Sequence, residues 1–263
     1  MSGFFHGTNM LHLFDGNNHA RVEFEVDPTG LPLRRLFSKA YYSIAPEIYI
    51  FDGPNSKALR LAQYPEYKSK RKPPPDNFMI MLGFYKELLM HTNKVMIDLP
   101  GYEADDVIAT ICRRNPGVPI TIHSTDRDFC ALEDEFITVP GANLKGVARD
   151  DVRLYKTLCG DTSDSISGIE KFGPKAWAEL TSENKAYWTE VLESKMLVTA
   201  DYQRLGITRP LFANWLSFNY QKLQIFWDII GFYSVPEELI AQHTRVGTKD
   251  FELAESKLRD LLQ

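Results

Sequence analysis

Three short hydrophobic runs in this sequence are each followed directly by an aspartate, namely Asp15, Asp52 and Asp126. Acids recur at later positions and bring the acids in these motifs to nine, the others being Glu103, Asp105, Asp106, Asp128, Asp161 and Asp164. Carboxylates that converge repel one another unless a cation offsets their charge, and hard divalent cations prefer oxygen ligands. The acids therefore predict a divalent-metal site. The simpler alternative is that they decorate surface loops.

The segments that would position these acids alternate between strand and helix patterns. Short β-rich runs predict strands over residues 10–14, 48–51, 94–97, 119–125 and 136–139, and amphipathic patterns predict helices over 33–42, 77–91 and 105–114. This alternation predicts an α/β fold with a mainly parallel central sheet and flanking helices. Ligands of such sheets bind outside the carboxyl ends of the strands, so we expect the acids to meet there.

A second candidate site is basic. Lys68, Lys70, Arg71 and Lys72 fall within five residues, and three prolines follow them. The net charge of −5 argues against a nucleic-acid partner only if it is spread evenly, because without the nine motif acids the rest of the chain is positively charged. The basic run therefore either contacts phosphate or forms an ordinary solvated face.

A glycine-punctuated segment, 168–175, carries a third pattern. Gly168 and Gly173 can adopt backbone conformations closed to other residues, and Lys175 comes at the start of the next predicted helix. A tight hairpin that exposes N–H groups beside a helix N-terminus can bind a phosphate backbone without reading its sequence. Two glycines at this spacing can also simply end one helix before another begins.

Composition sets the wider limits. At 263 residues and 44% hydrophobic content, the chain is long enough for a large domain and a smaller one. Strand signals become scarce after about residue 150, so we expect a sheet domain over 1–150 and a helical region over 151–263. We find neither an apolar run of about 18 residues nor a signal peptide, and three scattered cysteines suit a reducing compartment. We therefore expect a cytoplasmic protein, without a membrane partner.

Six motifs occur together and in a fixed order. They are Phe51-Asp52-Gly53, Tyr67 to Asp76, Glu103 to Ile108, Ser124 to Asp128, Gly160 to Asp164 and Gly168 to Lys175. In this order they resemble the flap endonuclease family of 5′ nucleases, especially the 5′-nuclease domain of bacterial DNA polymerase I and the stand-alone phage 5′ exonucleases. The resemblance covers about residues 10–180.

The resemblance implies roles for these residues. The nine acids would surround two or more Mg²⁺ ions, directly or through water, with Mn²⁺ as a substitute. Lys68 and Arg71 would contact the scissile phosphate at the base of a helical arch, about residues 68–91. Arg21 would match the family's active-site arginine, although it comes one residue early.

The resemblance also implies a helix-hairpin-helix at about residues 160–180, which grips duplex DNA and often binds a potassium ion. The residues expected to contact DNA are Lys70, Lys72, Gly168, Ile169, Gly173 and Lys175.

The implied activity is hydrolysis of DNA at 5′ ends, flaps or nicks, by a monomer of bacterial or phage origin, in replication, repair or phage DNA metabolism. RNA–DNA hybrids stay open as substrates. One alternative is a metal-dependent RNase of the related small-domain type, which needs neither arch nor hairpin. The other is a non-catalytic DNA-binding protein, which the presence of all nine acids disfavours.

Overall fold

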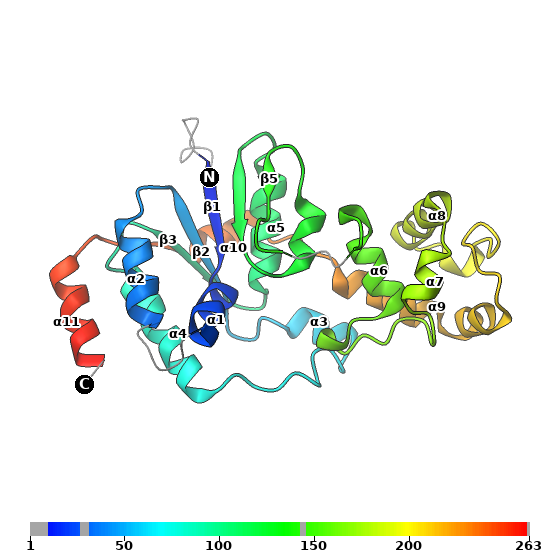
Figure 1. Cartoon of the computed structure of the whole chain (residues 1–263), viewed down its shortest axis with the longest axis horizontal. Coiled ribbons are helices and arrows are strands. Elements are labelled where there is room, and N and C mark those ends of the chain that lie inside the picture. Colours follow the sequence, from blue (N-terminus) through cyan, green and yellow to red (C-terminus); the bar gives the residue numbers. More distant parts are fainter. Residues whose placement is uncertain (1–9, 27–31, 143–145, 262–263) are drawn as a thin grey trace. The chain divides into compact units, whose positions relative to one another are not determined.

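The computed structural model describes residues 10–26, 32–142 and 146–261 (Figure 1). The chain forms two compact units, which are described separately. The sheet unit comprises Met1–Ala58, Pro73–Asn143 and Tyr233–Gln263, and the helical unit comprises Leu59–Lys72 and Leu144–Phe232. The expected domains, 1–150 and 151–263, are each one continuous stretch, whereas each of these two units is built from separate stretches of the chain. The basic run belongs to the helical unit, and the last segment of the chain returns to the sheet unit.

The sheet unit is built on six strands in the order β5-β4-β1-β2-β3-β6. Strands β1 to β5 pair in parallel, and β6 pairs antiparallel with β3. The central strands are buried on both faces, which explains their continuous hydrophobic runs. The predicted parallel sheet is thereby confirmed, with strands β1 (Leu11–Asp15), β2 (Glu47–Asp52), β3 (Val95–Leu99), β4 (Ile120–His123), β5 (Ile137–Thr138) and β6 (Thr244–Val246).

Helices flank this sheet. One hydrophobic cluster joins side chains of the central strands to four helices, namely α1 (Gly16–Val26), α2 (Pro32–Tyr42), α4 (Asp76–Leu89) and α11 (Phe251–Leu261). Helix α5 (Ala104–Arg114) contacts β1 and β2, and α10 (Glu237–Gln242) contacts β3. A 3₁₀ turn, Arg127–Leu132, follows β4. The three predicted helices are confirmed as α2, α4 and α5.

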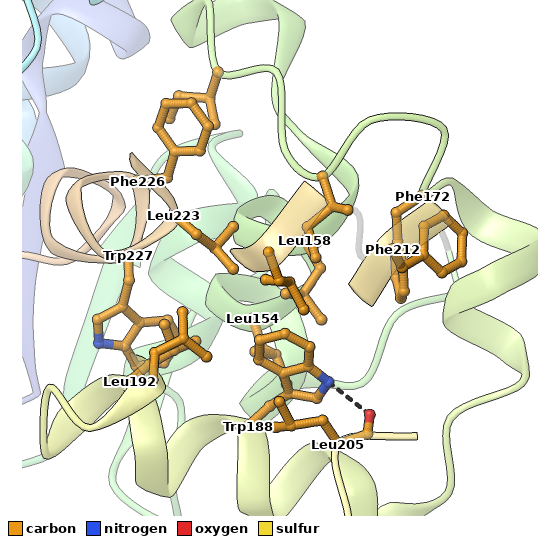
Figure 2. Close-up of a cluster of buried hydrophobic side chains, with 14 of the residues drawn as sticks. Leu154, Leu158, Phe172, Trp188, Leu192, Leu205, Phe212, Leu223, Phe226 and Trp227 are labelled. Carbon is orange, nitrogen blue, oxygen red and sulfur yellow. Dashed lines mark hydrogen bonds between the residues drawn. The ribbon is translucent and has the colours of Figure 1, made fainter. Parts of the chain in front are cut away.

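The helical unit has its own apolar core. Trp188 is fully buried and donates its indole N–H to the Leu205 carbonyl at 2.9 Å (Figure 2). Phe226 and Trp227 lie in the same cluster, so these aromatic residues serve packing. Its helices are α3 (Ala58–Gln63), α6 (Val152–Cys159), α7 (Pro174–Ala178), α8 (Ser182–Glu193) and α9 (Pro210–Ile230), with 3₁₀ turns at Arg149–Asp151, Thr162–Asp164 and Leu197–Thr199.

Two elements of the sheet unit differ from expectation. Helix α1 was not predicted because its first turn, Gly16-Asn17-Asn18, consists of poor helix formers. Strand β6 lies in the region expected to be helical, and it is too short and too polar to give a strand signal. No helix within the described ranges is long and apolar enough to cross a membrane.

Candidate active site

The carboxyl edge of the sheet gathers three of the predicted acids. Asp15 and Asp52 are the last residues of β1 and β2, which pair in parallel. Asp126 follows β4, which pairs with the other side of β1. Because these strands run in one direction, their acids lie at one edge of the sheet, as the hydrophobic runs predicted.

Electrostatics at this edge disfavour a charged Asp15. Burial and the neighbouring negative charge of Asp52 raise the pKa of Asp15 to about 7, and Asp126 adds to the effect. The Asn18 N–H and the Ser124 hydroxyl donate to the Asp15 carboxylate at 3.1 Å each and act in the opposite direction. A cation bound here would relieve the repulsion, which is the electrostatic pattern of a metal site.

The N-terminus of α5 supplies the next acids. The Ala104 N–H donates to Asp52 Oδ1 at 2.9 Å. Glu103 and Asp106 form a reciprocal capping box. The Asp106 side chain is fully buried, and its Oδ1 accepts the Tyr233 N–H at 2.8 Å. Asp105 accepts the Asp106 N–H at 2.8 Å. Asp106 thus connects the N-terminus of α5 to the C-terminal segment that begins at Tyr233 by a hydrogen bond.

The loop after β4 is held by hydroxyl contacts. Ser124 Oγ, which donates to Asp15, also accepts the Asp126 N–H at 3.1 Å. Asp126 in turn accepts the Asp128 N–H at 3.0 Å and caps the following 3₁₀ turn. The loop conformation therefore depends on the acids themselves.

The donor chemistry at this edge fits a hard divalent cation, because the gathered groups are carboxylate oxygens. Among the described residues, no group of three or more acid, histidine or cysteine side chains is arranged to hold a metal ion. The acids are instead held by the N–H and hydroxyl contacts described above.

The remaining two acids lie in the helical unit. The Lys156 ammonium contacts Asp161 Oδ2 at 2.8 Å, and both side chains are buried. Although burial alone would raise the pKa of Asp161, Lys156 and Ser163 outweigh it and lower the pKa to about 2. Burial raises the pKa of Asp164, and the positive charge of Lys68 only partly opposes this rise.

The basic run contacts the same loop. The Lys68 N–H donates to the Asp164 carbonyl at 3.0 Å, and the Arg71 guanidinium lies 3.7 Å from Asp164 Oδ1. The Lys70 N–H donates to Ser165 Oγ at 3.2 Å. Lys70, Arg71 and Lys72 are exposed, whereas Lys68 is half-buried with a φ of 53°. The structure thus joins the basic run to the Asp161–Asp164 motif.

The glycine segment follows α6. Gly168 has a φ of 63°, and a Cβ there would lie 2.4 Å from the Gly160 nitrogen, so glycine is required. Gly173 does not meet the expectation, because its φ of −115° is open to other residues. Ile169 is 1% exposed and its N–H donates to the Leu158 carbonyl, so it belongs to the core. Lys175 is exposed in the five-residue helix α7.

The 5′-3′ exonuclease N-terminal resolvase-like domain matches residues 34–155. DNA polymerase I of Caldicellulosiruptor bescii is 35% identical over 206 residues, which are 66% of this chain and 24% of that protein. The 5′-3′ exonuclease of Aquifex aeolicus is 30% identical over 192 residues, 63% of this chain and 66% of that protein. Over these residues the chain is similar to the 5′-3′ exonuclease family. It spans less than two thirds of the length of either relative.

The same fold occurs in phage T5 5′-exonuclease with bound zinc, at a TM-score of 0.65 and 19% identity over 97% of this chain and 98% of that one. It also occurs in the T5 flap endonuclease in a pseudo-enzyme-product complex with DNA and metal ions, at a TM-score of 0.61, 18% identity and the same coverage. At these identities the likeness establishes the fold alone.

Two features of the candidate site concern α1. Arg21 pairs with Glu25 and lies over the Phe78 ring at 5.2 Å, so in this structure its guanidinium contacts its own helix and α4. The asparagines Asn17 and Asn18, which sequence reasoning did not select, contact Asp52 and Thr125. The sequence feature that could have identified them is their position directly after Asp15 and Gly16, at the end of a predicted strand.

Proposed function

We propose that this chain is a structure-specific 5′ nuclease that hydrolyses DNA phosphodiesters at 5′ ends and flaps with the help of divalent metal ions. The observation that carries the proposal is the gathering of Asp15, Asp52 and Asp126 at the carboxyl edge of the sheet, where burial and like charge raise the pKa of Asp15. Sequence similarity to the 5′-3′ exonuclease N-terminal resolvase-like domain over residues 34–155 supports the same function.

We assign the metal ligands to the nine motif acids, and Mg²⁺ is the ion we propose, with Mn²⁺ as a substitute. Carboxylates are suited to hard divalent cations. When bound, two such ions would lower the pKa of the attacking water and stabilise charge on the leaving 3′ oxygen. The protein contributes Ser124 and the N–H groups of Asn18 and Ala104, which orient the carboxylates of Asp15 and Asp52.

We assign Lys68 and Arg71 to the scissile phosphate. Fixed cations near a reacting phosphate stabilise the charge that develops in the transition state, and one donor of this kind contributes about a hundredfold in rate. Contacts of both residues with the Asp161–Asp164 motif support this assignment, because they hold the basic run in one conformation.

We assign duplex binding to the Gly160–Lys175 hairpin, with a potassium ion as its proposed cofactor. The DNA contacts would come from the Gly168 backbone and from Lys70, Lys72 and Lys175, which are exposed. The T5 relative solved with DNA and metal ions supports a DNA substrate. The 5′ terminal nucleotides would leave the duplex at a cost of a few kcal/mol and pass the basic segment of about residues 68–75, because the rest of the expected arch, about residues 68–91, is mostly helix α4, which packs into the core of the sheet unit. We propose that the protein acts as a monomer.

The test is cleavage of four 5′-labelled substrates: a flap, a blunt duplex, a single strand and an RNA–DNA hybrid. Each is incubated with Mg²⁺, with Mn²⁺ and with EDTA. We expect metal-dependent products from the 5′ end of the flap or duplex, and their lengths separate flap cutting from exonucleolysis. Binding without cleavage in either metal would indicate a non-catalytic DNA-binding protein. Cleavage of only the RNA strand of the hybrid, with no cleavage of the DNA substrates, would indicate an RNase.

A further inference from the structure

We propose that Asn17 and Asn18 are positioning residues that hold the strand-end carboxylates in the arrangement that metal binding requires. Both lie in the first turn of α1, directly after Asp15, and each joins α1 to a different neighbouring strand end. The inference rests on the proposed function, because it assigns how the same site is organised.

Asn17 holds Asp52. Its amide Nδ2 donates to Asp52 Oδ2 at 3.1 Å, and its Oδ1 accepts the Asp52 backbone N–H at 3.4 Å. The Ala104 N–H donates to the other carboxylate oxygen, Oδ1, at 2.9 Å. The Asp52 carboxylate is therefore oriented from two sides, by α1 and by α5. A neutral amide achieves this without adding another negative charge to a crowded site.

Asn18 holds the loop that carries Asp126. Its Oδ1 accepts the Thr125 N–H at 3.0 Å, and its Nδ2 donates to Thr125 Oγ1 at 2.8 Å. Thr125 directly precedes Asp126, so these two bonds fix the position of the backbone just before Asp126. The Asn18 backbone N–H also donates to Asp15 Oδ1 at 3.1 Å, which links the loop to the end of β1.

The first turn of α1 packs closely against β2 at Gly16 and Phe51. A Cβ at Gly16 would lie 2.4 Å from Cε1 of Phe51, so only glycine lets the helix begin against β2. Phe51 directly precedes Asp52, and the contact therefore brings Asn17 to the strand end. The sequence Asp15-Gly16-Asn17-Asn18 thus supplies an acid, a close contact and two amides in consecutive residues.

Groups that orient metal ligands matter strongly, since their mutation typically costs about 10–100-fold in metal affinity or activity. We expect Asn17→Ala and Asn18→Ala to weaken Mn²⁺ binding to the DNA-free protein about tenfold or more by calorimetric titration. We also expect the single-turnover cleavage rate at limiting Mg²⁺ to fall by a similar factor, with DNA affinity unchanged.

The matched control is Glu23→Gln, because Glu23 lies on the same helix and the substitution removes its ion pairs with Arg35 and Lys39. It should lower the melting temperature and leave Mn²⁺ binding unchanged. Asn18→Asp is the conservative variant, because its carboxylate can accept both the N–H and the hydroxyl of Thr125. It should bind Mn²⁺ more tightly than Asn18→Ala. Serine variants at both positions replace any alanine variant that does not fold.

The outcomes separate this inference from the proposed function. If the asparagine variants only lower the melting temperature, as Glu23→Gln does, and bind Mn²⁺ like the wild type, the positioning role is overturned. If the wild type cleaves none of the substrates but the variants still weaken Mn²⁺ binding, the positioning role stands and the proposed activity fails.

Discussion

Asp15 at the carboxyl edge of the sheet and Asp161 in the helical unit have opposite electrostatics. At Asp15, burial and the charges of Asp52 and Asp126 raise the pKa to about 7. At Asp161, the buried Lys156 ammonium outweighs the effect of burial and lowers the pKa to about 2. A carboxylate that carries its own counter-ion is stable when charged, whereas one surrounded by other acids is stable only with an added cation. The comparison teaches that these motif acids do not share one electrostatic role.

The largest expected effect is on catalysis at the sheet edge. Asp126→Asn should reduce flap or duplex cleavage by about a thousandfold or more, since it removes a metal ligand, and should largely spare DNA binding. Single-turnover rates and a binding titration in Ca²⁺ or EDTA measure the two effects. Asp260→Asn, an exposed acid near the end of α11, is the matched control and should behave as wild type. Retained Mg²⁺-dependent cleavage would remove Asp126 from the site.

The second prediction concerns the helical unit. Lys156→Met should lower the free energy of unfolding by about 3–5 kcal/mol, because it leaves the buried Asp161 charge without its partner. Urea unfolding at pH 7 measures the change. Adding Asp161→Asn to this variant should recover part of the loss. If the two variants were additive, the ion pair would not be what stabilises this loop.

The third prediction tests the basic run. Lys68→Ala should slow single-turnover cleavage by about a hundredfold while DNA affinity changes far less, as expected of a group that acts on the reacting phosphate. Lys72→Ala, at an exposed position of the same run, is the control and should affect affinity more than rate. An unchanged rate for Lys68→Ala would leave this lysine outside the site.

The smallest effect is one of stability without metal. Asp15→Asn should raise the free energy of unfolding by about 2 kcal/mol at pH 8 in EDTA. Removing the crowded charge stabilises the folded state by about 4 kcal/mol, and weaker hydrogen bonds from the Asn18 N–H and the Ser124 hydroxyl to an amide offset about half of this gain. The folded pKa, about 7, lies above the unfolded value of 3.8, so this cost is present above pH 7. It disappears as the pH falls toward 4. The difference between wild type and variant, measured by urea unfolding at several pH values, should therefore shrink on acidification.

Much of the sheet edge could be predicted because hydrophobic runs identify strands, and parallel strands place their last residues at one edge. The contact between Lys68 and the Asp164 carbonyl could not be predicted, since it joins segments nearly a hundred residues apart in sequence. Helix α1 could not be predicted because Asn17 and Asn18 in its first turn have low helix propensity. Their side chains contact the ends of neighbouring strands instead.

The return of the chain to its first unit affects the order of folding during synthesis. Strand β6 pairs with β3 as the outermost strand on that side of the sheet. Ala254 and Leu258 of α11 are buried in the cluster that includes side chains of α1, α2 and α4. The helical segment 144–232, by contrast, is complete before these residues are made. Domains emerge from the ribosome N-terminus first. The helical unit can therefore finish folding before residues 233–263 are synthesised, whereas the sheet unit, which contains the start of the chain, needs these residues to complete its fold.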